Sequence, residues 1–131
     1  MIYLDSSVAL ARLLTEPRSA PVSFWKQKLV SSRLLEYETW NRIHARQLAH
    51  TLGGQVRELI DLIQIVELSP AVLGRALEPF PTPLRTLDAL HMASLEYMRG
   101  RGQEVELASF DARLIAGARA LQISLYDFSA A

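Results

Sequence analysis

The sequence predicts an α/β fold with a mostly parallel central sheet of four or five strands and helices on both faces. Short apolar runs typical of strands alternate along the chain with segments whose apolar residues recur at helical spacing. No internal repeat or low-complexity stretch interrupts this alternation. Strands that alternate with helices are typical of a parallel sheet with a helical layer on each face.

The first thirty residues predict a strand, a helix and a second helical stretch. The apolar run MIYLD at residues 1–5 predicts the strand. The segment after it has helical spacing and is closed by Pro17. Helical spacing returns in FWKQKLV, residues 24–30, whose end overlaps LVSS, residues 29–32, a candidate short strand.

The middle of the chain predicts two helices and a strand. Residues 34–52 form the longer helix, which we expect to end at Gly53 and Gly54 because glycine is favoured at helix C-termini. A shorter helix covers residues 55–63, and IVEL at residues 65–68 predicts the next strand.

The last third of the chain begins with a loop. EPFPTPLR, residues 78–85, contains three prolines and is expected to be extended. An amphipathic helix follows over residues 86–100. The remaining elements are a strand, a helix and a strand, at residues 104–111, 112–121 and 123–128.

The composition is that of one folded domain over residues 1–131. Half of the residues are apolar and 21% are charged, as in ordinary globular proteins. The sequence has no cysteine, which excludes disulfide frameworks and thiolate metal sites and suits a cytoplasmic setting. No segment has the pattern of a secretory signal or the length of a membrane span. We therefore expect a soluble cytoplasmic protein with no membrane contact.

The charge balance argues against general binding of polyanions. Fourteen basic and fourteen acidic residues cancel, so any contact with nucleic acid must come from a local patch. Arginine dominates the basic side, with Lys26 and Lys28 as the only lysines. Arginine binds phosphate through a planar fork, but the same bias also arises from GC-rich genomes.

Two aspartates end predicted strands directly before predicted helices. Asp5 ends the first strand, and Asp111 ends the strand at residues 104–111. Because ligands of open α/β sheets bind at the carboxyl ends of the strands, both side chains are candidates for a functional site. Each is also a favourable helix N-cap, and for either residue alone that alternative stays open.

Glu38 is the least expected carboxylate. At 100° per residue it falls within the apolar stripe of the predicted helix 34–52, with Asn41 beside it, whereas Glu36 lies on the polar side. The stripe consists of Leu34, Ala45, Leu48, Ala49 and Leu52. A carboxylate on a core-facing stripe costs several kcal/mol unless it is paired or bound to a metal. Glu38 is therefore a candidate ligand.

Asp88 lies in the first turn of the predicted helix 86–100, at the border of its apolar stripe. That stripe consists of Leu87, Leu90, Tyr97 and Met98. After a Thr86 N-cap, an aspartate here stabilises the helix N-terminus, which is a sufficient structural reason for its presence. Together with Asp5, Glu38 and Asp111, it also forms a hard-oxygen set suited to Mg²⁺ or Mn²⁺. Such ions activate water and stabilise the charge of phosphodiester hydrolysis.

Four short motifs are similar to those of a known family. In order along the chain, YLDSS, SSRLLEYE, LRTLDALHMASL and ASFDARL resemble the PIN-domain ribonucleases, most closely the toxins of VapC type. The resemblance covers nearly the whole chain and implies a PIN-like three-layer sandwich. It implies that the acidic residues hold divalent cations for endonucleolytic cleavage of RNA. The matching positions are Asp5, Glu38, Asp88 and Asp111.

The resemblance also implies supporting residues and partners. Ser7 and Ser109 match the family's hydroxyl residues, although a threonine is usual at the position of Ser109. A toxin of this kind acts on RNA, forms a homodimer and is silenced by a small cognate antitoxin that covers the acidic groove. Phe24, Trp25 and Trp40 are candidates for antitoxin contacts, with core packing as the alternative.

Other interpretations of the same residues are open. His91 follows Asp88 by about one helical turn, and a hydrogen-bonded core histidine is its expected role rather than a metal ligand. No nucleophile-elbow glycines support a catalytic Ser6 or Ser7. The alternative function is a non-catalytic PIN-like module that binds protein or RNA, although the presence of all four acidic residues argues against it.

Overall fold

The computed structural model describes residues 1–130, and in this range four parallel strands form one sheet in the order β3-β2-β1-β4. The strands are β1 (Ile2–Leu4), β2 (Leu29–Ser32), β3 (Ile63–Val66) and β4 (Glu106–Ala108). Ile2 of the central strand β1 pairs with Leu29 on one side and with Glu106 on the other. Because parallel strands need long crossover connections, helices join them.

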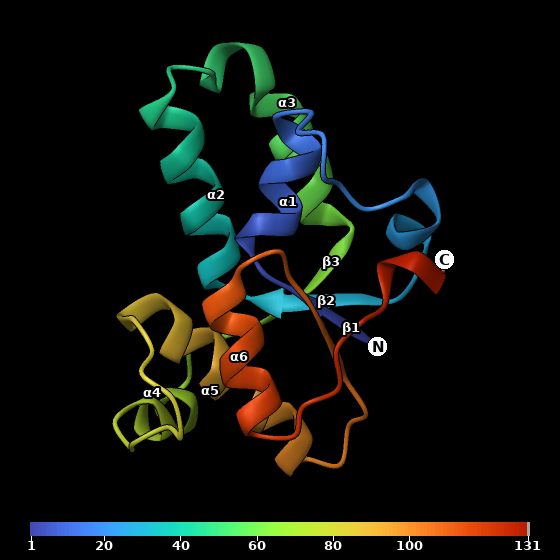
Figure 1. Cartoon of the computed structure of the whole chain (residues 1–131). Helices are drawn as coiled ribbons and strands as arrows, with labels where there is room; N and C mark the ends of the chain where they lie inside the picture. The colour runs from blue at the N-terminus through green and yellow to red at the C-terminus, as the bar shows by residue number, and fades with distance from the viewer. Residues whose placement is uncertain (131) are drawn as a thin grey trace.

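Six α-helices lie between and after these strands within residues 1–130 (Figure 1). They are α1 (Ser6–Leu13), α2 (Leu34–Ala45), α3 (Ala49–Asp61), α4 (Pro70–Ala76), α5 (Thr86–Gly100) and α6 (Ala112–Ala120). Two short 3₁₀ segments are η1 (Val22–Lys26) and η2 (Phe128–Ala130). None of the helices in this range is long and apolar enough to cross a membrane.

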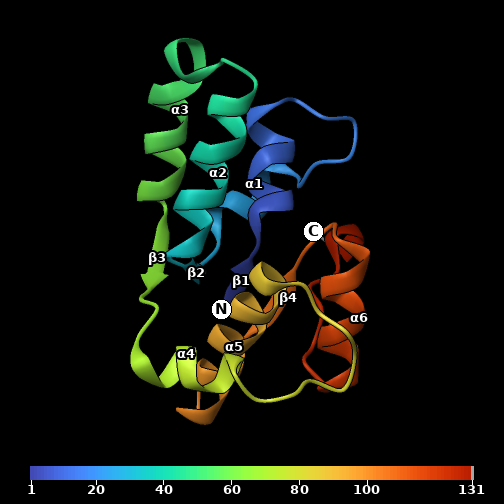
Figure 2. The ribbon, with the colours of Figure 1, turned by 90° about the vertical axis from the view of Figure 1, so that its left-hand side faces the viewer.

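The helices cover both faces of the sheet. Figure 2 shows α1, α2 and α3 grouped on one side and α4, α5 and α6 on the other. Successive side chains of β1 point to opposite faces. Ile2 and Leu4 pack with α1, α2 and α3, whereas Tyr3 packs with α5 and α6. All three residues are buried, as is typical of a central parallel strand. The predicted three-layer α/β fold is confirmed.

The predicted long helix at residues 34–52 is wrong. α2 ends at Ala45, residues 46–48 form a turn in which Gln47 has φ 57°, and α3 then continues through Gly53 and Gly54. Hydrogen bonds from Gln47 N to His44 O and from Leu48 N to Ile43 O close α2. A Cβ on Gly53 would lie 3.4 Å from Trp40 Cη2, so this glycine marks the close approach of two helices rather than a helix end.

The helix break changes which side chains face the core. The buried residues of α2 are Leu34, Leu35, Thr39 and Ile43, whereas Ala45 of the predicted stripe is exposed. Of the four residues in the predicted stripe of α5, Met98 is buried and the other three are not. The buried residues of α5 are His91, Met92, Ala93, Ser94, Leu95 and Met98. Leu87 is 39% exposed, so the core-facing side of α5 is the side that carries His91.

Other element boundaries also differ from the prediction. Residues 24–30 form no α-helix, because η1 ends at Lys26 and Leu29 begins β2. β3 begins at Ile63 rather than at residue 65. Residues 123–128 contribute one isolated bridge, between Leu125 and Leu107, instead of a fifth strand.

α4 is not among the predicted helices, although its N-terminus carries recognisable signals. Ser69 Oγ accepts a hydrogen bond from Val72 N at 3.3 Å, and Pro70 occupies the first turn. The loop at residues 78–85 has no helix or strand, as its three prolines predict.

Candidate active site

Asp5 is the centre of a buried hydrogen-bonded cluster. It follows β1 directly and is 4% exposed. Ser7 Oγ donates to Asp5 Oδ1 at 2.6 Å, and Ser109 Oγ donates to Oδ2 at 2.9 Å. The two serine hydroxyls in turn accept hydrogen bonds from the backbone N–H groups of Phe110 and Asp111, each at 2.9 Å. The cluster therefore joins the carboxyl ends of β1 and β4, which are neighbours in the sheet.

The surroundings of Asp5 make its ionised form less favourable than it is in water. Burial raises the pKa of the Asp5 carboxyl to about 6, and the negative charge of Asp111 adds to this rise. The hydrogen bonds from Ser7 and Ser109 and the charge of His91 lower the same pKa, but by less than burial raises it. A carboxylate that is desolvated in this way gains more from a bound cation than an exposed carboxylate does.

Asp111 caps α6 and also borders the cluster. Its Oδ1 accepts hydrogen bonds from the backbone N–H groups of Arg113, at 2.9 Å, and Leu114, at 3.4 Å. The N-cap interpretation of Asp111 is therefore correct. It does not exclude a second role, because both capping bonds use one oxygen. Asp5 occupies the N-cap position of α1 but makes no side-chain capping bond, so helix capping does not account for its carboxylate.

Asp88 is half-buried in the first turn of α5. The expected Thr86 N-cap is wrong, because Arg85 occupies that position and makes no side-chain capping bond. Desolvation raises the pKa of the Asp88 carboxyl, and the charges of Asp111 and Glu38 raise it further. His91 and Arg85 lower it. These mutual effects place Asp88 within electrostatic reach of two other predicted site residues.

Glu38 ends a hydrogen-bonded chain that links β1, α5 and α2. Glu38 Oε1 lies 2.5 Å from His91 Nε2, and His91 Nδ1 lies 2.7 Å from the Tyr3 hydroxyl. Tyr3 and His91 are buried, and the Glu38 side chain is 15% exposed. An ionised carboxylate can only accept, so Nε2 carries a hydrogen; in the neutral ring Nδ1 then accepts the Tyr3 hydroxyl proton. His91 is thus the hydrogen-bonded core histidine that the sequence predicts.

Other candidate residues lie away from this arrangement. Within residues 1–130, Asn41 makes no hydrogen bond to the four carboxylates and is exposed on α2. Glu36 lies 3.5 Å from Arg33 in a surface ion pair. Phe24 is completely buried, and Trp25 and Trp40 pack against the same core, so core packing explains the three aromatic side chains.

Comparison with known proteins identifies the family. The model of the PIN domain matches residues 2–120. The chain belongs to the PIN domain family. Ribonuclease VapC47 of Mycobacterium tuberculosis is 29% identical over 126 residues, which cover 91% of this chain and 90% of that protein.

Solved structures show that this PIN domain shares its fold with toxins. A toxin–antitoxin complex from Klebsiella pneumoniae has a TM-score of 0.64 at 14% identity and covers 92% of this chain and 94% of that one. VapC20 of Mycobacterium tuberculosis, described as a sarcin–ricin loop cleaving toxin, has a TM-score of 0.63 at 18% identity. The match covers 88% of this chain and 94% of VapC20. At such identities the likeness concerns the fold alone.

The carboxylates of this PIN domain suit a hard cation in chemistry but are not arranged around one point. Within residues 1–130, no three aspartate, glutamate or histidine side chains are placed to hold one ion. Glu38 is turned toward His91, and both oxygens of Asp5 accept from serines. The donor set fits Mg²⁺ or Mn²⁺ because it consists of carboxylates that disfavour one another's charge.

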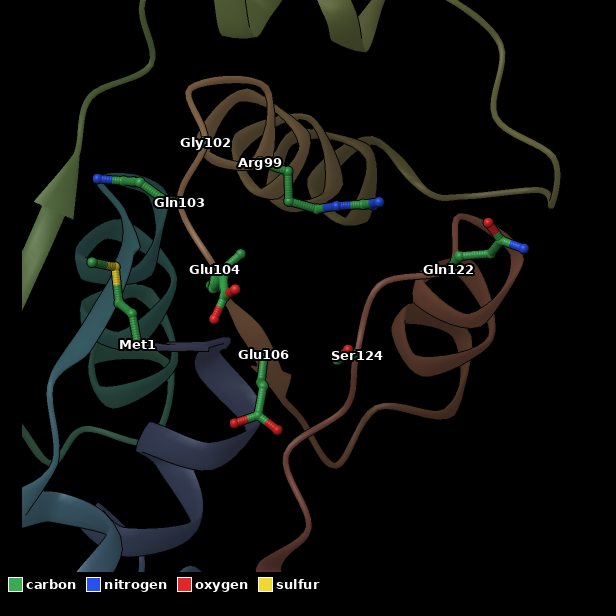
Figure 3. Close-up of a pocket in the computed structure, with 9 residues that line it drawn as sticks. Met1, Arg99, Gly102, Gln103, Glu104, Glu106, Gln122 and Ser124 are labelled. Atoms are coloured by element: carbon green, nitrogen blue, oxygen red, sulfur yellow. The ribbon is translucent and has the colours of Figure 1, made fainter.

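Two pockets of the PIN domain lie at opposite ends of the sheet. One, of about 440 Å³, is lined by Asp5, Ser7 and Asp111, but not by Glu38 or Asp88. The other, of about 630 Å³, involves Glu104 and Glu106 beside Met1, near the amino ends of β1 and β4 (Figure 3). Because ligands bind at the carboxyl ends of such sheets, the smaller pocket is the candidate site.

Tyr3, Arg18 and Arg42 lie at this site and are missing from the sequence-based candidates. Tyr3 holds His91, and Arg18 lines the pocket of Asp5 and Asp111. A tyrosine inside a short apolar strand is a usable signal, because a buried hydroxyl needs a hydrogen-bond partner. No local pattern marks Arg18, which lies in the irregular segment between α1 and η1.

Proposed function

We propose that this chain is a divalent-metal-dependent endoribonuclease that acts as the toxin of a toxin–antitoxin pair. A PIN-domain ribonuclease toxin is the function that the relatives support. The observation that carries the proposal is the environment of Asp5. Its carboxylate is buried at the carboxyl edge of the sheet and oriented by two serines. The charge of Asp111 acts on both Asp5 and Asp88, and the charge of Glu38 acts on Asp88.

In this proposal Asp5, Glu38, Asp88 and Asp111 hold Mg²⁺ or Mn²⁺. PIN-domain ribonucleases of this type generally depend on divalent metals. When bound, such an ion supplies an activated water and neutralises charge on the phosphate. Ser7 and Ser109 fix the orientation of Asp5 through one hydrogen bond to each oxygen. Because its side chain is already held in one orientation, Asp5 loses less rotational freedom when RNA and metal bind.

His91 acts as a positioning residue in the same proposal. Its Nε2–H donates to Oε1 of Glu38, which leaves Oε2 for a metal. The Tyr3 hydroxyl holds the other ring nitrogen, so the imidazole cannot turn away. Hydrogen bonds behind the ligands commonly orient the ligating groups of metal sites.

The proposed partners are RNA as substrate and a small cognate antitoxin. The curated relative is named a ribonuclease, and one structure with the same fold is a toxin–antitoxin complex. An acidic groove whose carboxylates repel one another would attract a cationic antitoxin side chain. A homodimer and a cytoplasmic location follow from the family resemblance and complete the proposal.

The test is RNA cleavage by the purified protein. Structured RNAs incubated with Mg²⁺ or Mn²⁺ should be cut, and EDTA should stop the reaction. Asp5→Asn should be inactive because it removes the buried carboxylate. Cleavage that continues undiminished in excess EDTA would exclude the metal mechanism. RNA binding without cleavage under any divalent metal would instead favour a non-catalytic binding module.

A further inference from the structure

Two arginines line the pocket that contains Asp5 and Asp111. Arg18 comes from the segment after α1, and Arg42 comes from the last turn of α2. The pocket has a volume of about 440 Å³, and its third acidic side chain is Glu16. Its wall therefore carries guanidinium groups next to the carboxylates of the candidate active site.

Neither arginine is used by the fold as an ion-pair partner. Arg33 and Arg75 pair with glutamates, at distances of 2.5–3.5 Å. Within residues 1–130, by contrast, Arg18 and Arg42 have no carboxylate within ion-pair distance, and both are exposed. Their N–H donors are therefore open to an anion from solution.

Arg18 is also held in place. Its guanidinium carbon lies 4.7 Å from the centre of the Phe110 ring. That ring is itself fixed, because it packs on Phe128 with ring centres 4.8 Å apart and its backbone N–H donates to Ser7 Oγ. Stacking holds the guanidinium plane but leaves the N–H groups at its edge available. Phe110 thus couples the position of Arg18 to the serine that orients Asp5.

The chemistry of the substrate explains why such groups are needed. RNA is a polyanion, and a cluster of carboxylates repels it wherever a cation does not neutralise them. A guanidinium binds a phosphate through parallel N–H donors, which adds geometry to charge. Because the chain has no net charge, attraction of RNA has to come from a local patch.

We propose that Arg18 and Arg42 form a phosphate-binding subsite that holds the RNA strand beside the bond that is cut. This inference rests on the proposed ribonuclease function. The two arginines bind the substrate and take no part in the chemical step. Their loss therefore weakens RNA binding and raises KM, with kcat changed within a few-fold.

The subsite can be tested by RNA binding in the non-cleaving Asp5→Asn background. The probe is a fluorescein-labelled single-stranded RNA of mixed sequence, followed by anisotropy at several salt concentrations with Mg²⁺ present. Arg18→Gln and Arg42→Gln should each weaken binding by about three- to tenfold at low salt. Each should also make the binding less sensitive to salt. The slope of log K against log salt should become less negative by about 0.7, as expected for one lost phosphate contact.

Arg12→Gln is the matched control. Arg12 is also exposed and also stacks on an aromatic ring, with its guanidinium carbon 4.6 Å from the centre of Trp25, but it does not line the pocket of Asp5. It should leave affinity and salt slope unchanged. An equal loss in Arg12→Gln would indicate general charge attraction and overturn the subsite.

Cleavage assays on the protein with Asp5 intact test the proposed ribonuclease function and the arginine subsite separately. If it does not cut RNA with Mg²⁺ or Mn²⁺, the proposed function fails. If it cuts RNA and the Arg18 and Arg42 variants bind and cut as wild type does, only the subsite fails. Raised KM with retained kcat in both variants supports the subsite, whereas a selective loss of kcat contradicts it.

Discussion

The carboxyl group of Asp5 makes its contribution to stability depend on pH. Its folded pKa of about 6 lies above the ordinary value of 3.8, so the folded chain binds this proton more tightly than the unfolded chain. Stability should therefore fall as pH rises from about 4 to about 6, and the loss should persist at higher pH. A rise of this size corresponds to a cost on the order of 3 kcal/mol.

Asp5→Asn should remove this pH dependence. In metal-free buffer the variant should gain stability relative to wild type as pH is raised from 4 to 7, because no buried charge has to form. Urea unfolding of both proteins at several pH values measures the difference. Asp61→Asn, an exposed aspartate on α3, is the control and should follow wild type. A parallel pH profile for Asp5→Asn would show that Asp5 does not titrate as described.

Single residues of the site were predictable where their position in a strand or helix can be read from the neighbouring sequence. Asp5 and Asp111 end strands before helices, so their meeting at one sheet edge follows from the parallel topology. The prediction of Glu38 rested on an apolar stripe that in fact combines residues of α2 and α3. Glu38 nevertheless borders the buried face of α2. The Tyr3–His91 bond joins residues 88 positions apart, and no local pattern indicates such a contact.

At the scale of elements, His91 joins three of them: α5 carries the ring, β1 provides Tyr3 and α2 provides Glu38. His91→Gln and His91→Asn separate the two hydrogen bonds, because the Gln amide reaches the place of Nε2 and the Asn amide that of Nδ1. If His91 positions Glu38, His91→Gln should keep most of the cleavage. His91→Asn should lose about 10- to 100-fold in activity and need more Mn²⁺ for half-maximal rate.

Thermal melting of the two His91 variants provides the control for this comparison. Both variants replace a buried ring by a smaller side chain, so both should melt below wild type. A purely structural role would lower melting temperature and activity together in both variants and leave the Mn²⁺ requirement unchanged. That outcome would contradict a positioning role for His91.

Helix boundaries were the least predictable feature at this scale. The turn after α2 is formed by Gln47 in a left-handed conformation, without the glycine that usually marks it. Gly53 and Gly54, which suggest an end, lie inside α3. Tertiary packing decides these cases, because Gly53 allows Trp40 of α2 to approach. α4 has standard N-terminal signals at Ser69 and Pro70 and was predictable from them.

For the whole molecule, the alternation of strands and helices was sufficient to predict the layers. A central strand without charged residues predicts cover on both faces, and helices lie on both. The strand order β3-β2-β1-β4 does not follow from the alternation, because several right-handed crossover patterns fit the same sequence. The motif resemblance predicted the PIN family but no strand order, and the match over residues 2–120 confirms the family.

The central claim is that one acidic site, assembled from separate elements, cleaves RNA. The most direct test compares Glu38→Gln with Glu36→Gln, two residues apart on α2, under identical Mn²⁺ and RNA concentrations. Glu38 contacts His91 at the site, whereas Glu36 pairs with Arg33 on the surface. Glu38→Gln should reduce the cleavage rate by at least about 100-fold. Glu36→Gln should stay within a few-fold of wild type. Equal rates for the two variants, or a selective loss in Glu36→Gln, would contradict this assignment of the site.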